Sequence, residues 1–203
     1  MSKSHHTLAD WDFEYGAQYR SLASDYFISA PTSLKHTLCP ATILNTVLCR
    51  IPETQCLPQG EVRIWCRRYA GGFYPAIFRN QAALGTSNDI NCYQIDISGN
   101  TAFFYRRLNH IPTLQGQTPC YNPAEEWVHY RVFWYNGKTP GDADALCVDI
   151  YVEVAGEWYK QGNTMYDTNP YWGDSEINRC GFGVQLLSGH TRWHDDTEIW
   201  GPV

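Results

Sequence analysis

Apolar and polar residues alternate in short runs along most of this chain, a pattern typical of half-buried strands. Pairs such as Ser98-Gly99, Asn136-Gly137 and Ala155-Gly156 separate the runs and predict turns. The alternation predicts strands over residues 11–15, 26–28, 33–38, 43–50, 61–69, 72–79, 91–97, 101–108, 127–135, 145–154, 157–160, 180–187 and 192–200. Residues 109–126 and 161–178 are rich in Pro, Asn, Gly and Thr, so we expect two long loops there.

The longer predicted strands each have an aliphatic face and a mixed face. In residues 61–69, Val62 and Ile64 share one face, while Arg63 and Trp65 share the other. The aliphatic faces predict a core between two antiparallel sheets, and its expected members are Val62, Ile64, Val128, Val132, Val148, Ile150 and Val184. We expect one domain over residues 1–203, in which residues 1–10 form a flexible N-terminus.

Composition supports an all-β class and excludes others. The chain has 30 aromatic residues among 203, and aromatic side chains favour strands. The net charge of −6 excludes a basic footprint for nucleic acid, and no apolar run is long enough to span a membrane. The first residues lack the apolar core of a signal peptide, so we expect assembly in the cytoplasm.

The eight cysteines indicate buried thiols more than a metal site. No C-x-x-C string occurs, which argues against structural zinc. Cys66 and Cys147 fall within strand patterns and are expected to be buried. Cys49 and Cys56 bracket a short loop and could form a bridge, which a virion or a hyperthermophile's cytoplasm would reconcile with the missing signal.

The mixed faces combine flat aromatic rings with hydrogen-bonding charges. Sugars offer C–H surfaces for stacking and hydroxyl groups for hydrogen bonds, so such a face suits a glycan. The alternative is a face covered by the protein's own loops or by a neighbouring subunit. The residues expected to make the contact are Arg63, Trp65, Arg67, Tyr105, His129, Arg131 and Tyr151.

Several motifs resemble one known family. They are Trp127-Val-His-Tyr-Arg-Val-Phe-Trp, Leu146-Cys-Val-Asp-Ile-Tyr-Val-Glu-Val-Ala-Gly-Glu-Trp, Cys180-Gly-Phe-Gly-Val-Gln, His194-Asp-Asp-Thr-Glu-Ile-Trp and Asp12-Phe-Glu-Tyr-Gly. Together they resemble the concanavalin A-like lectin/glucanase (laminin-G-like) superfamily. The resemblance implies an all-β, two-sheet antiparallel jelly-roll sandwich whose opening strand pairs with the closing one. It implies function weakly, because this fold hosts lectins, glycosidases, lyases and structural adhesins.

The residues that catalysis would need in that family are missing. No E-x-D-x-x-E or E-x-D-x-E string supplies the paired carboxylates of a glycosidase. The lyase string Q-[IV]-H is replaced by Gln94-Ile-Asp96. We therefore expect no enzyme activity, although His129, Arg131 and Tyr105 could form a base, a charge clamp and an acid if they share a face.

The resemblance also implies a place for a structural calcium ion beside the terminal strands. Its candidate ligands are Asp12, Glu14, Asp195 and Asp196. The alternative is that these acids face solvent and accept hydrogen bonds from turn amides. We expect no required cofactor.

These observations predict a non-catalytic lectin-like surface or structural protein, such as a decoration or fibre component of a phage or virus particle. Its expected partner is a glycan or a neighbouring protein subunit, with a homo-oligomer among the open arrangements. A free-standing carbohydrate-binding lectin is the alternative, followed by a polysaccharide lyase or a glycoside hydrolase.

Overall fold

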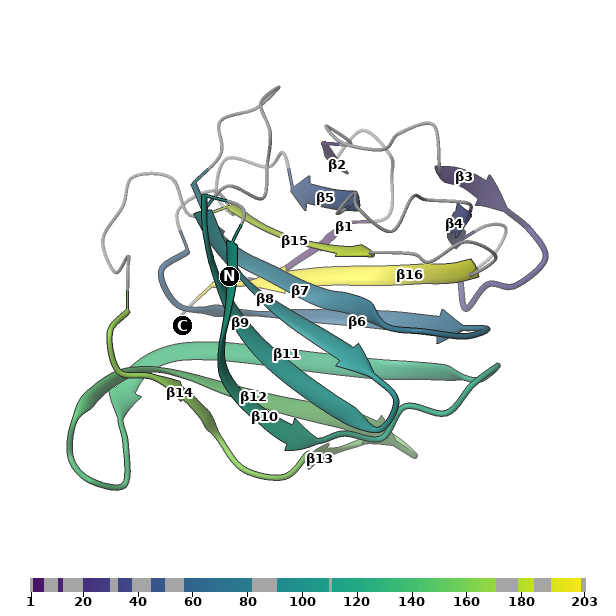
Figure 1. Ribbon diagram of the computed structural model, residues 1–203. Coiled ribbons are helices and arrows are strands. Elements are labelled where there is room, and N and C mark those ends of the chain that lie inside the picture. The colour runs from purple at the N-terminus through teal and green to yellow at the C-terminus, as the bar shows by residue number, and fades with distance from the viewer. Residues whose placement is uncertain are drawn as a thin grey trace.

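The structure is a computed structural model that describes residues 2–5, 11–12, 20–29, 33–37, 45–49, 57–81, 91–109, 111–170, 179–184 and 191–201. Within these residues every regular element is a β-strand, and the strands form two antiparallel sheets (Figure 1). No helix in this part of the chain is long and apolar enough to cross a membrane. The predicted all-β sandwich of two antiparallel sheets is confirmed.

The larger sheet has nine strands. Its main path is β13 (Glu157–Lys160), β12 (Asp144–Val154), β11 (Trp127–Lys138), β6 (Gly60–Arg68), β16 (Thr191–Trp200), β4 (Ser33–Thr37) and β3 (Arg20–Ala23). In addition, β1 (Ser2–His5) pairs with β16, and β14 (Met165–Asp167) pairs with β12. The long strands β12, β11, β6 and β16 are neighbours, so they form one continuous surface.

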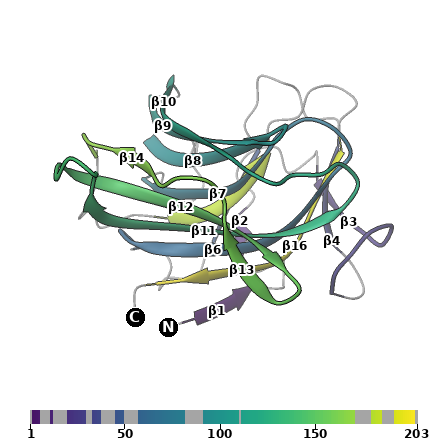
Figure 2. The ribbon, with the colours of Figure 1, turned by 90° about the horizontal axis from the view of Figure 1, so that it is seen from below.

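The smaller sheet has seven strands. Its order is β10 (Ile111–Pro119), β9 (Thr101–Leu108), β8 (Asn91–Ser98), β7 (Phe73–Asn80), β15 (Arg179–Val184), β5 (Asn45–Cys49) and β2 (Trp11–Asp12). Figure 2 shows β8, β9 and β10 in one layer and β6, β16 and β1 in the other.

The core lies between the inner faces of the two sheets, where strand alternation placed it. Six of the seven predicted core residues are between 0% and 4% exposed, and the side chain of the seventh, Val184, lies outside the described residues. Phe78 stacks on Trp134 with ring centroids 4.7 Å apart and on Tyr93 at 5.7 Å. These rings join the smaller sheet to the larger one.

The predicted turn at Asn136-Gly137 is wrong, because both residues lie inside β11 and pair with β12. A side chain at Gly137 would place its Cβ 2.9 Å from Cys147 Sγ and 3.1 Å from the Tyr135 ring. The glycine therefore serves close packing along a strand and not a reversal of the chain.

Each predicted long loop contains a strand. The first contains β10, whose Pro112 and Pro119 are tolerated because β10 is the edge strand of its sheet. The second contains β14. Conversely, residues 26–28 were predicted as a strand but form bends.

The N-terminal part also differs from expectation. Ser2–His5, expected within a flexible terminus, forms β1 and pairs with the closing strand β16. The resemblance assigned that pairing to the segment beginning at Asp12. Asp12 instead lies in β2, which pairs with β5 in the smaller sheet.

The cysteine predictions are confirmed where the structure describes them. Cys66 and Cys147 are 2% and 1% exposed, and both are free thiols. The suggested bridge between Cys49 and Cys56 lies outside the described residues, since only the backbone of Cys49 is described.

Candidate functional site

The outer face of the nine-stranded sheet carries its side chains in rows that cross three strands. Read from β11 through β6 to β16, the rows are Phe133, Glu61 and Trp200; Arg131, Arg63 and Glu198; His129, Trp65 and Asp195; Trp127, Arg67 and Trp193. β12 extends two rows with Asp149 beside Phe133 and Tyr151 beside Arg131. We call this surface the aromatic–arginine face.

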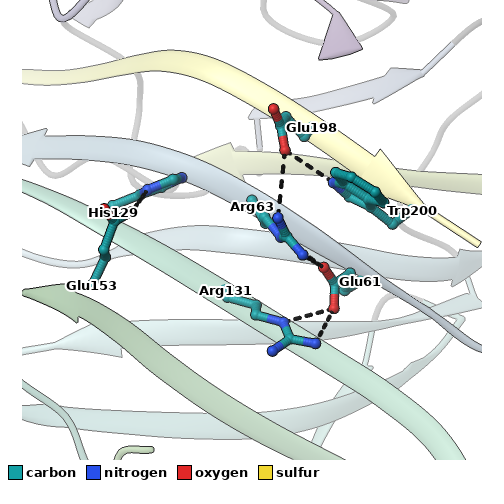
Figure 3. Close-up of polar contacts among 7 residues, drawn as sticks. All are labelled: Glu61, Arg63, His129, Arg131, Glu153, Glu198 and Trp200. Carbon is teal, nitrogen blue, oxygen red and sulfur yellow. Dashed lines mark hydrogen bonds and ion pairs between the residues drawn. The ribbon is translucent and has the colours of Figure 1, made fainter. Parts of the chain in front are cut away.

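A buried carboxylate, Glu61, lies between two arginines on this face. Arg63 donates from Nε to Glu61 Oε1 at 2.7 Å, and its Nη2 lies 2.6 Å from the same oxygen. Arg131 donates from Nε to Oε2 at 2.6 Å, and its Nη2 lies 2.5 Å from that oxygen (Figure 3). Each oxygen thus takes two N–H groups from one guanidinium, so both arginines are held in one orientation.

The next strand holds Arg63 from its other side. The Arg63 guanidinium lies 4.4 Å from the centroid of the Trp200 ring, within cation–π distance. Trp200 Nε1 donates to Glu198 Oε2 at 3.0 Å, and that oxygen is 3.9 Å from Arg63 Nη1. Glu198 and Trp200 can act together because they are two residues apart on one strand and therefore share a face.

The surface beside these groups is hollowed into a depression of about 470 Å³. Its lining consists of Gln59, Gly60, Glu61, Arg63, Arg131, Phe133, Trp200 and Gly201. The rings of Phe133 and Trp200 supply apolar walls, and the arginine–glutamate group supplies fixed donors and acceptors. Such a mixture is typical of small-molecule sites.

A second part of the face is a stack of flat rings. Trp65 and His129 are nearly parallel, with centroids 4.5 Å apart and planes at 11°, and Trp158 of β13 contacts His129 at 4.8 Å. Burial lowers the pKa of His129, although Glu153 Oε2, 2.5 Å from Nδ1, acts in the opposite direction. The stack is therefore uncharged at neutral pH.

Residues 26–29 pack against the far end of the face. The Arg67 guanidinium lies 4.0 Å from the centroid of the Tyr26 ring, which contacts Trp193 edge-on at 5.0 Å. Asp195 Oδ2 accepts hydrogen bonds from the amides of Ile28 at 2.7 Å and Ser29 at 3.1 Å. These contacts explain why residues 26–28 do not form the predicted strand.

The candidate calcium ligands do not form one group among the described residues. Asp195 accepts the turn amides named above, and Asp196 Oδ1 accepts a hydrogen bond from Ser29 Oγ at 2.6 Å. Hydrogen bonds from turn amides were the alternative to calcium binding for these acids. Asp12 lies in the other sheet, and its side chain and all of Glu14 are outside the described residues. No cluster of three or more His, Cys, Asp or Glu suited to a metal ion occurs in the described part of the chain, and calcium stays a prediction.

The structure brings together six of the seven predicted contact residues on the aromatic–arginine face: Arg63, Trp65, Arg67, His129, Arg131 and Tyr151. The seventh, Tyr105, lies in β9 of the smaller sheet. The suggested group of His129, Arg131 and Tyr105 is therefore not assembled on one face. Alternation within a strand shows which residues share a side, but it does not show which sheet the strand joins.

Sequence reasoning missed the acidic half of the site. Glu61 and Glu198 were not among the predicted contact residues, although Glu61 alternates in phase with Arg63. This two-residue spacing puts Glu61 on the same face as Arg63, so the sequence could have predicted Glu61 as a contact residue. Nothing local in the sequence pairs Glu198 with Arg63, because the register between β16 and β6 joins residues 135 positions apart.

A separate polar cluster lies on the outer face of the seven-stranded sheet. Gln94 is paired with Tyr105, and Arg107 Nε donates to Gln94 Oε1 at 2.6 Å; Gln94 is 2% exposed and Arg107 8%. Burial raises the pKa of Asp96 to about 7, against the opposing effect of Arg107. Burial, reinforced by the nearby Asp96, also raises the pKa of Tyr105. The cluster therefore holds a carboxyl group that titrates near neutral pH beside a phenol.

Comparison with known proteins identifies similar folds but no protein family to which the chain belongs. No protein-family model matches the chain, and no curated protein sequence is significantly similar to it. Among solved structures, the PL-14 alginate lyase from Aplysia kurodai superposes with a TM-score of 0.58 and 12% identity over 91% of this chain and 88% of that one. The carbohydrate-binding module CBM66 from Bacillus subtilis gives 0.51 and 10% identity over 96% and 93%. The alginate lyase Aly36B gives 0.54 and 10% over 100% and 98%.

These similarities define a class of fold. The chain has the concanavalin A-like jelly-roll fold, which confirms the resemblance seen in its motifs. Carbohydrate-binding modules and lyases share this fold. At these low identities the likeness concerns the fold alone.

Proposed function

We propose that this protein is a non-catalytic carbohydrate-recognition module that binds glycans on the aromatic–arginine face. The arrangement around Glu61 carries the proposal, because one carboxylate holds two arginines beside a depression lined by Phe133 and Trp200. Sugar C–H surfaces can pack on the rings while hydroxyl groups bond to the polar groups. Since these polar groups are already ordered, binding costs little further side-chain entropy.

The state of the carboxylates supports recognition over hydrolysis. A retaining glycosidase needs one carboxylate as nucleophile and one protonated carboxyl as acid, about 5–5.5 Å apart. Both oxygens of Glu61 are engaged by arginines, and Glu198 is bonded to Trp200. Glu61 is therefore not available for attack without breaking these contacts. The absence of an E-x-D-x-x-E string agrees with this interpretation.

Two substitutions test the proposal. Trp65→Ala removes a ring of the stack, and Arg131→Ala removes one guanidinium while Arg63 still balances Glu61. Each variant should lose about tenfold or more in affinity on a glycan panel. Trp65→Ala should melt close to the wild type, whereas Arg131→Ala should melt at a lower temperature but stay folded at the assay temperature, because Glu61 keeps only its contacts to Arg63. Tyr121→Ala is the control, since Tyr121 is 52% exposed and lies in the loop before β11.

The same experiment covers the predicted role in a virus particle, which is part of this proposal. If the wild type binds no glycan but assembles into a particle or symmetric oligomer that Trp65→Ala or Arg131→Ala disrupts, a neighbouring subunit occupies the face. Unchanged binding and assembly in both variants, each shown to be folded, would place the contact elsewhere on the molecule.

The cluster on the smaller sheet favours a second candidate, acid–base chemistry on an acidic polysaccharide. Asp96, titrating near pH 7, could accept a carbon-bound proton, and Tyr105 could protonate the leaving oxygen. Arg107 and Gln94 belong to the same cluster and could donate hydrogen bonds to a substrate carboxylate. Two of the similar structures are alginate lyases.

This second candidate has its own test. Incubation with alginate or pectate should produce unsaturated ends, measured by ultraviolet absorbance, and Asp96→Asn should abolish the signal. Absence of turnover by the wild type on both polymers would exclude elimination of these substrates.

A further inference from the structure

The charges around the depression compensate one another within the described residues. Arg63 and Arg131 share Glu61, and Glu198, which is not one of the lining residues, lies 3.9 Å from Arg63. Two arginines and one glutamate therefore line the hollow, and a second carboxylate, Glu198, lies beside Arg63, so neither arginine is left without a carboxylate partner.

We next consider the charged side chains in the neighbouring rows of the face. Lys160 Nζ is 2.7 Å from Asp149 Oδ1, and the uncharged His129 ring lies against Glu153. Arg67, farther along the face, contacts the Tyr26 ring and has no carboxylate partner among the described residues. The two arginines that line the depression, and Lys160, each have a carboxylate partner among the described residues.

An acidic ligand would have to disturb this balance. A carboxylate or sulfate that took over Arg63 or Arg131 would leave Glu61, which is 5% exposed, as a buried charge with one partner fewer. It would also approach Glu198 and a chain whose net charge is −6. A hydroxyl group can instead bond to the arginines and the glutamates without displacing either.

We infer that the depression takes a neutral glycan, built from sugars without carboxylate, sulfate or phosphate groups. The inference rests on the proposed function, because it names the class of sugar for that same site. Packing on Phe133 and Trp200 and hydroxyl bonds to the arginine–glutamate group supply the affinity, and bulk charge attraction does not contribute.

Affinity measurements on paired ligands test this inference. The wild type should bind neutral polysaccharides such as dextran, xylan or galactomannan and should not bind alginate or heparin at this face. Its affinity for the neutral ligand should change less than about twofold between about 0.05 and 0.5 M sodium chloride. Phe133→Ala should weaken binding about tenfold or more, while Tyr121→Ala should not.

A charge variant provides the matching gain of function. Glu198→Gln removes the acid beside Arg63 and leaves Arg63 and Arg131 with one carboxylate. This variant should acquire salt-sensitive binding of an acidic glycan. Failure to acquire it would contradict charge balance as the reason for exclusion.

Two results separate the inference from the proposed function. Acidic-glycan binding by the wild type that is lost in Phe133→Ala would overturn the neutral class but leave glycan recognition on this face. No binding of any neutral or acidic glycan would overturn both.

Discussion

Glu61→Gln should destabilise the protein more than any other single substitution of a charged side chain around the depression. The Glu61 side chain is 7% exposed and takes all four of its close N–H contacts from Arg63 and Arg131. Glutamine keeps the shape but removes the charge, so two guanidinium groups remain close together without a carboxylate between them. Its amide nitrogen also directs a donor toward one of the arginines.

The magnitude follows from burial. Removing one partner of a buried ion pair costs about 3–5 kcal/mol. The Arg63 and Arg131 side chains are 25% and 27% exposed, so water replaces part of the lost interaction. We therefore expect a loss at the lower end of this range, about 3 kcal/mol. For a chain of this length that corresponds to a fall in melting temperature of about 6–12 °C.

The assay is thermal and urea unfolding at neutral pH, followed by near-ultraviolet circular dichroism. Glu198→Gln is the matched control. The Glu198 carboxylate is 33% exposed and contacts a single arginine, Arg63, at the longer distance of 3.9 Å, so this substitution should change the free energy of unfolding by no more than about 1 kcal/mol. A Glu61→Gln variant no less stable than Glu198→Gln would refute the idea that the buried carboxylate holds both arginines.

Three further predictions concern stability. Ile150→Ala should cost about 2–5 kcal/mol in urea unfolding, because Ile150 is 1% exposed in the core; a cost below about 1 kcal/mol would contradict the packing. The folded pKa of Asp96, about 7, exceeds its ordinary value of 3.8, so the folded state loses stability as pH rises between these values. Asp96→Asn should therefore change the free energy of unfolding little near pH 4 and raise it by up to about 4 kcal/mol at pH 8. An equal effect at the two pH values would exclude ionisation of buried Asp96 as the cause. Gly162→Ala should destabilise by at least about 1 kcal/mol in thermal melts, because φ is +56° and the new Cβ would lie 2.1 Å from Thr118 Oγ1; an unchanged melt would show that the loop relaxes freely.

The sequence by itself determined the long central strands and their inward faces. Period-two alternation is a local property of a strand, so Val62, Val132 and Ile150 could be assigned to the core without knowledge of their partners. The same alternation placed Arg63, Trp65 and Arg67 together on an outward face, because residues two apart on one strand share a side.

Only the tertiary structure decided how these faces combine. Tyr105 has the same kind of local pattern as Arg131, yet its strand joins the other sheet. The edge strand β10 escaped prediction because an edge position tolerates the prolines that would disrupt a central strand. Glu61 becomes the centre of the candidate site because β11 and β16 flank β6 and place Arg131 and Glu198 in the row next to it. Register between distant strands depends on the packing of the whole chain, and no short stretch of sequence contains it.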